Sequence, residues 1–599
     1  MPNFLLDQLP APVLALTDAL QLRPLIQAGQ WLASLEKLMP LLYPSGDVDV
    51  EQLTNARTLR DALLSALRQT VETSTLPPET RMKFGTSGWR GLLAHDFTVH
   101  NVACVTQGLV EVLLRPELHP ILGVKDADDL RKRGCILAHD TRMMGPEFAD
   151  TAARVLLAHD IKVMLLGMAT TPEVSAAIAE TQAAFSINFT PSHNPFTYHG
   201  YKFNPSDGGP APATLTGPVA QRANEILAVG SGYAQLSLDA YQEAQQDPTR
   251  FQRLDPIDLY KQGLKRRFPW LNLETLVQQI NQRGLSLYID NGFGATTGKY
   301  ERLLEGIRPE LLHVYHAESD PLFGGANREP SVANFRQLQA RMQHDPAELI
   351  VGVMNDGDGD RFVGGGREAV LVMNKYGAMV VRYLARRLGL KGDVARSVMT
   401  SHMADVAQQI YLPEGKLHVT AVGFQYLRDA IPSSVNAWEE SDGMSPLGWS
   451  LDKDGLIAAL LLIQQVLDAN EEAEKLLERT EQELGSFYFE RRKVSGRLSG
   501  EALTRALHAS VSSMQVGSTF ELHGHKFTIQ QRLTIDGIKL VLDNGWWFGL
   551  RASGTEPVVR PYVETFTQPG ASEQDRQEAA AWQKRLADWL EALVAAAIQ

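Results

Sequence analysis

A short apolar run that ends in an aspartate recurs three times along the chain, and this repeat constrains the fold more than any other feature. The three runs are residues 135–140, 285–290 and 349–356. The first two are followed by apolar residues at helical spacing, which is the pattern of a strand–turn–helix unit. Open sheets built from such units bind ligands beyond the carboxyl ends of their strands, where these aspartates lie. The repeat therefore predicts an α/β fold with acidic side chains along a ligand crevice.

Other patterns divide the 599 residues into five predicted segments. Residues 1–80 carry leucines at helical spacing and predict a helical extension that serves as a structural cap or interface. A polar stretch at 247–255 and a Gly/Pro-rich stretch at 320–330 predict linkers, and one long helix is expected from 454 to 485. Short alternating strands and an amphipathic helix then predict an α+β domain. The expected segments are the extension at 1–80, three similar α/β domains at 81–255, 256–367 and 368–485, and the α+β domain at 486–599.

Charge and cysteine content exclude several classes of protein. The chain has 57 Lys and Arg against 70 Asp and Glu, a net charge of −13, which disfavours nucleic-acid and anionic-membrane partners. Two cysteines are too few for a disulfide framework or a Cys-based zinc site, and they fit a reducing compartment. No apolar run approaches the ~20 residues that span a bilayer, and no signal peptide is evident. We therefore expect a cytoplasmic protein in which any anionic ligand needs a local basic pocket.

The strongest chemical signal is the sequence NDGDGDR at 355–361. Its carboxylates occupy alternate positions, which lie ~6.6 Å apart on an extended strand that rises ~3.3 Å per residue. The intervening glycines let the backbone curl so that the oxygens converge on a hard cation such as Mg²⁺. An EF-hand would need Gly and Glu where Arg361 and Arg367 stand. The motif predicts a magnesium site, with an acidic surface turn as the alternative, and the candidate ligands are Asp356, Asp358 and Asp360.

A second motif, TPSHNP at 190–195, follows an apolar run and encloses one hydroxyl between two prolines. Ser192 is the candidate nucleophile, His193 is its polar neighbour, and Lys202 supplies a cation downstream. The Gly-x-Ser-x-Gly elbow of a hydrolase is absent. By itself, Ser-His-Asn is more often a cap or a turn, so this motif indicates function only together with the others.

A third motif, RASGTEP at 551–557, combines hydroxyls, a glycine-freed backbone and a guanidinium group. This combination is typical of a phosphate cradle, and an ordinary turn is the alternative. The motif lacks the Gly-Lys-Ser/Thr ending of a nucleotide P-loop. The candidate phosphate ligands are Arg551, Ser553, Gly554, Thr555 and Arg560.

Taken together, these motifs resemble the α-D-phosphohexomutases, the phosphoglucomutase/phosphomannomutase family. The resemblance covers residues from about 82 to the C-terminus and leaves the extension out. It implies four domains around a central cleft, each contributing one loop. The implied reaction moves phosphate between O1 and O6 of a hexose, with Mg²⁺ and a hexose 1,6-bisphosphate that serves as intermediate and activator. The motifs that carry the resemblance, in the family's order, are FGTSGWRG (84–91), TPSHNP (190–195), DGDGDR (356–361), EESDG (439–443) and RASGTEP (551–557).

By this resemblance Ser192 carries the phosphoryl group, and a phosphoserine oxygen completes the magnesium site of the three aspartates. A phosphoserine adds a charge of about −1.5 to −2 at neutral pH. One Mg²⁺ does not offset this charge together with three carboxylates, so cationic side chains are needed nearby. Lys202 is also the candidate general acid/base, and the 551–557 motif would hold the phosphate that is not reacting. The candidates for charge neutralisation are Arg90, Arg361, Lys202 and His193.

The remaining resemblances concern the sugar. Glu439 and Ser441 match the loop that contacts sugar hydroxyls, and Thr420 and Gly423 lie in a loop similar to the one that selects ring orientation. The form of the sugar loop and of the 84–91 motif favours glucose 1-phosphate as substrate. A phosphomannomutase or a dual-specificity enzyme is the alternative, and a phosphatase or a silent sugar-phosphate binding protein is less favoured. The chain departs from the family's pattern at three positions, namely His199, Gln425 and Trp438.

Overall fold

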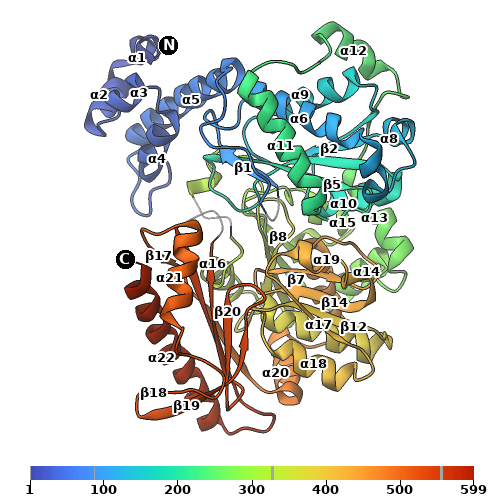
Figure 1. The fold of residues 1–599 in the computed structure, drawn as a ribbon, viewed down its shortest axis with the longest axis vertical. Coiled ribbons are helices and arrows are strands. Elements are labelled where there is room, and N and C mark those ends of the chain that lie inside the picture. The colour runs from blue at the N-terminus through green and yellow to red at the C-terminus, as the bar shows by residue number, and fades with distance from the viewer. Residues whose placement is uncertain (1, 86–87, 326–328, 554–556, 599) are drawn as a thin grey trace.

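The computed structural model describes residues 2–85, 88–325, 329–553 and 557–598, and it confirms the predicted fold class (Figure 1). A helical extension precedes three sheets of mixed strand direction and a final antiparallel sheet of seven strands. Within these ranges no helix is long and apolar enough to cross a membrane. The residue bounds of the five predicted segments stay a prediction. Below, the extension and the first to fourth domains refer to these segments in chain order.

The extension is a group of helices whose last member docks on the first domain. Its helices are α1 (Pro2–Gln8), α2 (Ala11–Ala19), α3 (Arg23–Gln27), α4 (Trp31–Leu42) and α5 (Val50–Thr73). Asp49 caps α5, because its side chain accepts hydrogen bonds from two backbone N–H groups of the first turn. One stripe of α5 is buried in the apolar cluster that includes α6 (Val99–Leu113), and its members are Leu59, Leu63, Leu67 and Val71.

The first sheet has the strand order β1-β5-β4-β2-β3-β6. Its parallel strands are β2 (Cys135–His139), β3 (Val163–Met168), β4 (Phe185–Phe189) and β6 (Phe251–Arg253), and its antiparallel strands are β1 (Trp89–Leu92) and β5 (Tyr198–Pro205). Leu137 of β2 faces the cluster that contains α6 and α9 (Gly145–Ala158), and Ile136 faces α10 (Thr171–Thr181). Because both faces are covered, the strands β2 and β3 are nearly continuous apolar runs rather than alternating ones. The other helices are α7 (His119–Leu122), α8 (Ala127–Arg133), α11 (Ala213–Val229) and α12 (Leu238–Gln246).

The second and third sheets repeat this plan of parallel strands with an antiparallel edge. The second sheet, β11-β10-β9-β7-β8, contains β7 (Ser286–Asp290), β8 (Leu312–Tyr315), β9 (Ile350–Asn355), β10 (Phe362–Gly365) and β11 (Val370–Leu371). The third, β13-β12-β14-β15, contains β12 (Asp393–Ser397), β13 (Leu417–Thr420), β14 (Ser434–Glu439) and β15 (Gly443–Pro446). Their helices are α13 (Pro256–Arg267), α14 (Leu273–Arg283), α15 (Lys299–Leu303), α16 (Val332–Met342), α17 (Met373–Leu388), α18 (Met403–Tyr411), α19 (Gly455–Ala469) and α20 (Ala473–Leu484).

The structure corrects two details of the sequence analysis. It places two of the three aspartate-ended runs in one sheet, because β7 and β9 both belong to the second sheet and β9 turns back into β10. The helix expected from 454 to 485 is two helices, since Asn470 ends α19 with a left-handed φ of 54°. The stretch at 247–255 is not only a linker, because it contains the edge strand β6.

The last domain is the predicted α+β unit. Its sheet contains β16 (Phe487–Arg491), β17 (Val494–Ser495), β18 (Thr519–Leu522), β19 (His525–Leu533), β20 (Ile538–Leu542), β21 (Trp547–Ala552) and β22 (Val558–Phe566). Helices α21 (Gly500–Ser510) and α22 (Glu573–Ile598) lie along one side of it (Figure 1). The apolar stripe of α22 is buried against the sheet through Trp582, Leu586 and Leu590.

Candidate functional site

The motif TPSHNP and the acidic motif NDGDGDR meet at the ends of two strands. Ser192 lies in the loop after β4, and its hydroxyl donates a hydrogen bond of 2.7 Å to Oδ2 of Asp356, which follows β9 and stands 164 positions away. The φ of Ser192 is 60°, a left-handed conformation that is rare for residues other than glycine. The loop is anchored by Thr190, which accepts from the N–H of Ser192 (3.0 Å) and donates to Asp140 (2.8 Å). The nucleophile predicted from sequence is therefore buried, strained and directed at a carboxylate.

Arg142, which the sequence analysis missed, holds this loop in place. Its guanidinium is buried and forms an ion pair of 3.2 Å with Asp140. It donates to four backbone carbonyl oxygens of the loop, those of Ser192 (3.0 Å), Asn194 (2.5 Å), Pro195 (2.6 Å) and Tyr198 (3.1 Å). The available signal was an arginine two residues after the aspartate that ends β2.

The three aspartates of the acidic motif form the predicted cluster. Asp356, Asp358 and Asp360 are buried, and one carboxylate oxygen of each lies within 4.8 Å of the others. Oδ1 of Asp358 and Oδ1 of Asp360 accept no hydrogen bond from the described residues. Burial, together with the charges of its two neighbours, raises the pKa of Asp356 to about 7. Buried carboxylate oxygens with unmet acceptor capacity fit a divalent cation such as Mg²⁺.

Two lysines lie against this cluster. Nζ of Lys202, in β5, is 2.5 Å from Oδ2 of Asp358 and 3.2 Å from Oδ2 of Asp360. Nζ of Lys453 is 3.0 Å from Oδ2 of Asp360. The sequence analysis named Lys202 and missed Lys453. The signal for Lys453 was the charged triplet at 452–454 directly before the apolar helix α19.

The other predicted neighbours are also present, and the burial of one of them disfavours the positive charge expected of it. Nε of Arg361 lies 3.7 Å from Oδ2 of Asp356, and Nη1 of Arg90 donates to Oδ1 of Asn194 at 3.0 Å. Nδ1 of His193 lies 3.4 Å from Oγ of Ser192. Burial, reinforced by Arg361 and Arg90, lowers the pKa of His193 well below its ordinary value. Burial of the ring therefore favours the neutral form of His193 in this arrangement.

The sugar-loop residues converge at the end of the third sheet. Glu439 ends β14, is buried, and accepts a hydrogen bond of 3.1 Å from the N–H of Gly423. Thr420 ends β13, the strand that leads into the same loop, and Ser441 follows the acidic pair. Glu440 is directed elsewhere, because it accepts a hydrogen bond of 2.6 Å from the hydroxyl of Ser397. Among the described residues, Glu439 is therefore the member of the acidic pair that forms a hydrogen bond with the 420–423 loop.

Two of the three departures from the family's pattern are core residues. Trp438 is fully buried against α17, where a Cβ added to Gly377 would lie only 2.4 Å from its ring. His199 is fully buried among aromatic rings, 4.8 Å from Phe148 between ring centroids. Gln425 is partly exposed in the short helix η4 (Phe424–Tyr426). Neither Trp438 nor His199 can therefore contact a sugar in this arrangement.

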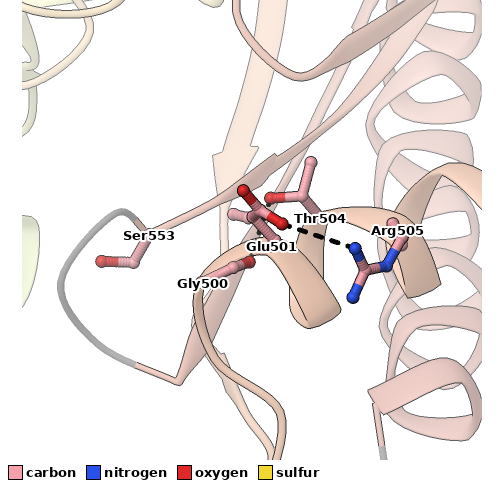
Figure 2. Close-up of a pocket in the computed structure, with 6 residues that line it drawn as sticks. Gly500, Glu501, Thr504, Arg505 and Ser553 are labelled. Carbon is pink, nitrogen blue, oxygen red and sulfur yellow. Dashed lines mark hydrogen bonds and ion pairs between the residues drawn. The ribbon is translucent and has the colours of Figure 1, made fainter.

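The described phosphate-loop residues lie on or directly after the interior strands β21 and β22 of the last sheet. Nε of Arg551 is 2.8 Å from Oδ2 of Asp536, which also accepts from the N–H of Val422 in the third domain at 3.1 Å. Arg560 stands opposite Arg551 in the β21–β22 ladder. Ser553 is buried, whereas the predicted ligands Gly554 and Thr555 lie outside the described residues. A pocket of about 410 Å³ lies between the end of β21 and the start of α21. It is lined by Gly500, Glu501, Thr504, Arg505, Ala552 and Ser553, and Figure 2 shows how these residues are arranged.

Family models match the four domains in order. Their descriptions are phosphoglucomutase/phosphomannomutase alpha/beta/alpha domain I (residues 81–229), domain II (265–365), domain III (373–484) and the C-terminal domain (497–581). Together these models match well over half of the chain. The helical extension lies before the first match.

Whole-chain comparisons agree with the domain matches. A phosphoglucomutase from Komagataeibacter xylinus is 28% identical over 575 residues, covering 88% of this chain and 95% of the relative. A phosphoglucomutase/phosphomannomutase from Thermococcus kodakarensis is 24% identical over 502 residues, covering 82% and 96%. The fold is similar to that of parafusin, a phosphoglucomutase from Paramecium in its open form, with a TM-score of 0.67, 19% identity, and coverage of 86% and 96%. It is also similar to a phosphoglucomutase/phosphomannomutase family protein from Burkholderia thailandensis, with a TM-score of 0.62, 18% identity, and coverage of 86% and 98%.

Proposed function

The chain belongs to the phosphoglucomutase/phosphomannomutase family of mutases, and on that premise we propose that it interconverts glucose 1-phosphate and glucose 6-phosphate. The proposed route passes through a phosphoserine at Ser192 and a glucose 1,6-bisphosphate intermediate. The observation that carries the proposal is the 2.7 Å contact between the Ser192 hydroxyl and Asp356. It joins a strained nucleophile to the acidic cluster, as transfer of a phosphoryl group requires.

In the proposed first step, the free hydroxyl of the sugar phosphate attacks the phosphorus on Ser192. The bond from phosphorus to Oγ of Ser192 breaks, Oγ gains the proton that the attacking hydroxyl loses, and the bisphosphate forms. The bisphosphate then turns over, and Oγ of Ser192 attacks the phosphorus of its other phosphate. The bond from that phosphorus to the sugar oxygen breaks, the sugar oxygen gains the proton that Ser192 loses, and the phosphoserine is restored. Such transfer depends mainly on position and on neutralised charge. Arg142 supplies the positioning, because its guanidinium donates hydrogen bonds to four carbonyl oxygens around Ser192.

Charge neutralisation is assigned to groups around the acidic cluster. Asp356, Asp358 and Asp360, with a phosphoserine oxygen, would hold Mg²⁺, which withdraws negative charge from the phosphoryl group. Lys202 and Lys453 lie within 3.2 Å of these carboxylates. Lys202 stays the proposed general acid/base. Arg361 and Arg90 complete the basic side of the site, and this local basic cluster is what an acidic chain needs to bind an anionic sugar phosphate.

The two ends of the substrate are assigned to separate loops. Glu439 and Ser441 would contact sugar hydroxyls, with Thr420 and Gly423 in the loop beside them. The 551–557 loop would hold the phosphate that is not reacting, which a bisphosphate intermediate needs and simple hydrolysis does not. We propose a cytoplasmic location as well, which the two free cysteines support. The proposed phosphate ligands are Arg551, Ser553, Gly554, Thr555 and Arg560.

A coupled assay with glucose 1-phosphate and mannose 1-phosphate, with and without the hexose bisphosphate, tests the function. We expect activity with both sugars, stimulation by the bisphosphate, and a larger kcat/KM for glucose 1-phosphate. A kcat/KM for mannose 1-phosphate that equals or exceeds it would instead favour the phosphomannomutase or dual-specificity alternative. Inactivity on both sugars under all these conditions would refute the mutase proposal.

A further inference from the structure

A strained turn lies between the N-terminal extension and the residue that holds the phosphoserine loop. Phe323, Gly324 and Gly325 have φ values of 58°, 62° and 68°, so three consecutive residues are left-handed. Glycine adopts this conformation freely, but a phenylalanine does so only when its surroundings impose it. Backbone strain of this kind is concentrated at functional sites. The turn falls in the stretch predicted as a Gly/Pro-rich linker.

The N-terminal extension contributes contacts that hold this turn in its left-handed conformation. Oδ1 of Asp320 accepts from the N–H of Leu322 at 2.9 Å, and Oδ2 accepts from the N–H of Gly324 at 3.1 Å. The hydroxyl of Tyr43, one residue after α4, donates to the same Oδ2 at 2.6 Å. The ring of Tyr43 also covers Gly325, where an added Cβ would lie 2.7 Å from Cδ2 of the ring. Tyr43 therefore fixes the carboxylate around which the turn is built.

On its other side the turn touches the anchor of the catalytic loop. The buried ring of Phe323 lies 4.9 Å from the guanidinium carbon of Arg142. Gly324 packs on Phe293, whose carbonyl oxygen accepts a hydrogen bond of 2.6 Å from Thr141, the residue before Arg142. The ring thus packs against the same guanidinium that donates to four carbonyls of the loop around Ser192.

A second contact of the extension reaches the same region along the chain. Arg68 of α5 forms an ion pair and hydrogen bond with Glu147, in the first turn of α9. Helix α9 begins three residues after Arg142. The extension therefore contacts both the turn at Phe323, which packs on Arg142, and helix α9, which begins just after Arg142. It contributes none of the residues assigned to the substrate.

We propose that the N-terminal extension positions the phosphoserine loop, with Tyr43 as a positioning residue that acts through Asp320, Phe323 and Arg142. The role assigned to the loop rests on the proposed function of Ser192. Loss of the Tyr43 hydroxyl frees one oxygen of Asp320 and lets the left-handed turn relax. The Phe323 ring then leaves the guanidinium of Arg142, and the loop becomes more mobile.

The test compares Tyr43→Phe with Tyr241→Phe in the full chain. Tyr241→Phe is the matched control, because it removes a hydroxyl that donates to Asp150 of α9 at 2.7 Å and does not bond to the turn. For Tyr43→Phe we expect kcat to fall about two- to tenfold, the effect of losing one hydrogen bond, with KM unchanged. Backbone amides of 190–199 should exchange with deuterium faster by a similar factor. Tyr241→Phe should change neither quantity, even if both variants lower the melting temperature.

A double variant tests the route. Tyr43→Phe combined with Phe323→Ala should be no slower than Phe323→Ala alone, because both changes remove the same contact with Arg142. Losses that multiply would overturn the route through Phe323. A Tyr43→Phe variant that matches Tyr241→Phe in both kcat and deuterium exchange would overturn the positioning role. Exchange is measurable without activity, so a wild-type protein that lacked mutase activity would refute the proposed function and still leave this inference testable.

Discussion

Gly200→Ala should displace the phosphoserine loop without touching any group assigned to chemistry. Gly200 lies in β5 opposite Arg90 of β1. A Cβ added there would lie 2.3 Å from the carbonyl oxygen of Thr190 and 2.6 Å from the nitrogen of Pro191. Ordinary contacts of a Cβ begin at 3.4 Å, so the Thr190–Pro191 backbone must retreat by about 1 Å. A backbone segment cannot rotate away as the end of a flexible side chain can.

This retreat should reach the nucleophile, because Thr190 bonds both the N–H of Ser192 and Asp140. A misplacement of about 1 Å in a reacting group lowers a rate by on the order of 10²-fold. Overpacking of this kind also costs about 1–3 kcal/mol of folding free energy. We therefore expect kcat to fall by about 10²-fold with KM nearly unchanged, since the nearest atoms to the added Cβ belong to Thr190 and Pro191 and to none of the residues proposed to bind the substrate.

The assay is the coupled mutase reaction at saturating sugar phosphate and bisphosphate, with urea unfolding measured in parallel. Gly217→Ala is the matched control, because its added Cβ meets nothing within 4 Å and it lies inside α11 of the same domain. That variant should retain its kcat. A Gly200→Ala protein with the wild-type kcat and unfolding midpoint would show that the loop moves freely and that the steric argument is wrong.

Three further predictions follow from the residues assigned to chemistry. Ser192→Ala should lower turnover by ~10³-fold or more and abolish the phosphopeptide seen by mass spectrometry, because no acceptor hydroxyl remains; more than a few per cent residual turnover would contradict the assignment. Asp358→Asn should lower kcat on the order of 10²-fold and weaken activation by Mg²⁺ in a titration, whereas full wild-type activity in excess chelator would exclude the metal. Arg551→Ala should mainly raise KM in steady-state kinetics, since the phosphate it contacts is the same in ground and transition states, and an unchanged kcat/KM would rule out the cradle.

Local patterns in the sequence predicted both the class of fold and most of the chemistry. Apolar runs of strand length with helical patterns between them report backbone periodicity, which neighbouring residues determine. The acidic motif could be assigned to a cation because its three carboxylates lie within five residues of each other. The family resemblance followed from the order of such short motifs, and the domain models match the same order.

The tertiary structure decided which distant residues meet. No local pattern places Ser192 beside Asp356, since the contact depends on how two separate sheets pack. Arg142 and Lys453 join the site through contacts with other segments, and the local signals beside them do not reveal which segments those are. Burial of Trp438 against α17 likewise shows that one of the three departures from the family's pattern lies in the core.

The N-terminal extension is the clearest example of a contact that the sequence alone does not reveal. Its helical spacing predicted helices and a structural role, because an apolar stripe must be buried somewhere. Its contact with the turn that presses on Arg142 depends on Tyr43 meeting Asp320, 277 positions away. Periodicity is a property of adjacent residues, whereas a pairing across such a distance is chosen by the free energy of the whole packed chain, and only the folded structure reveals it.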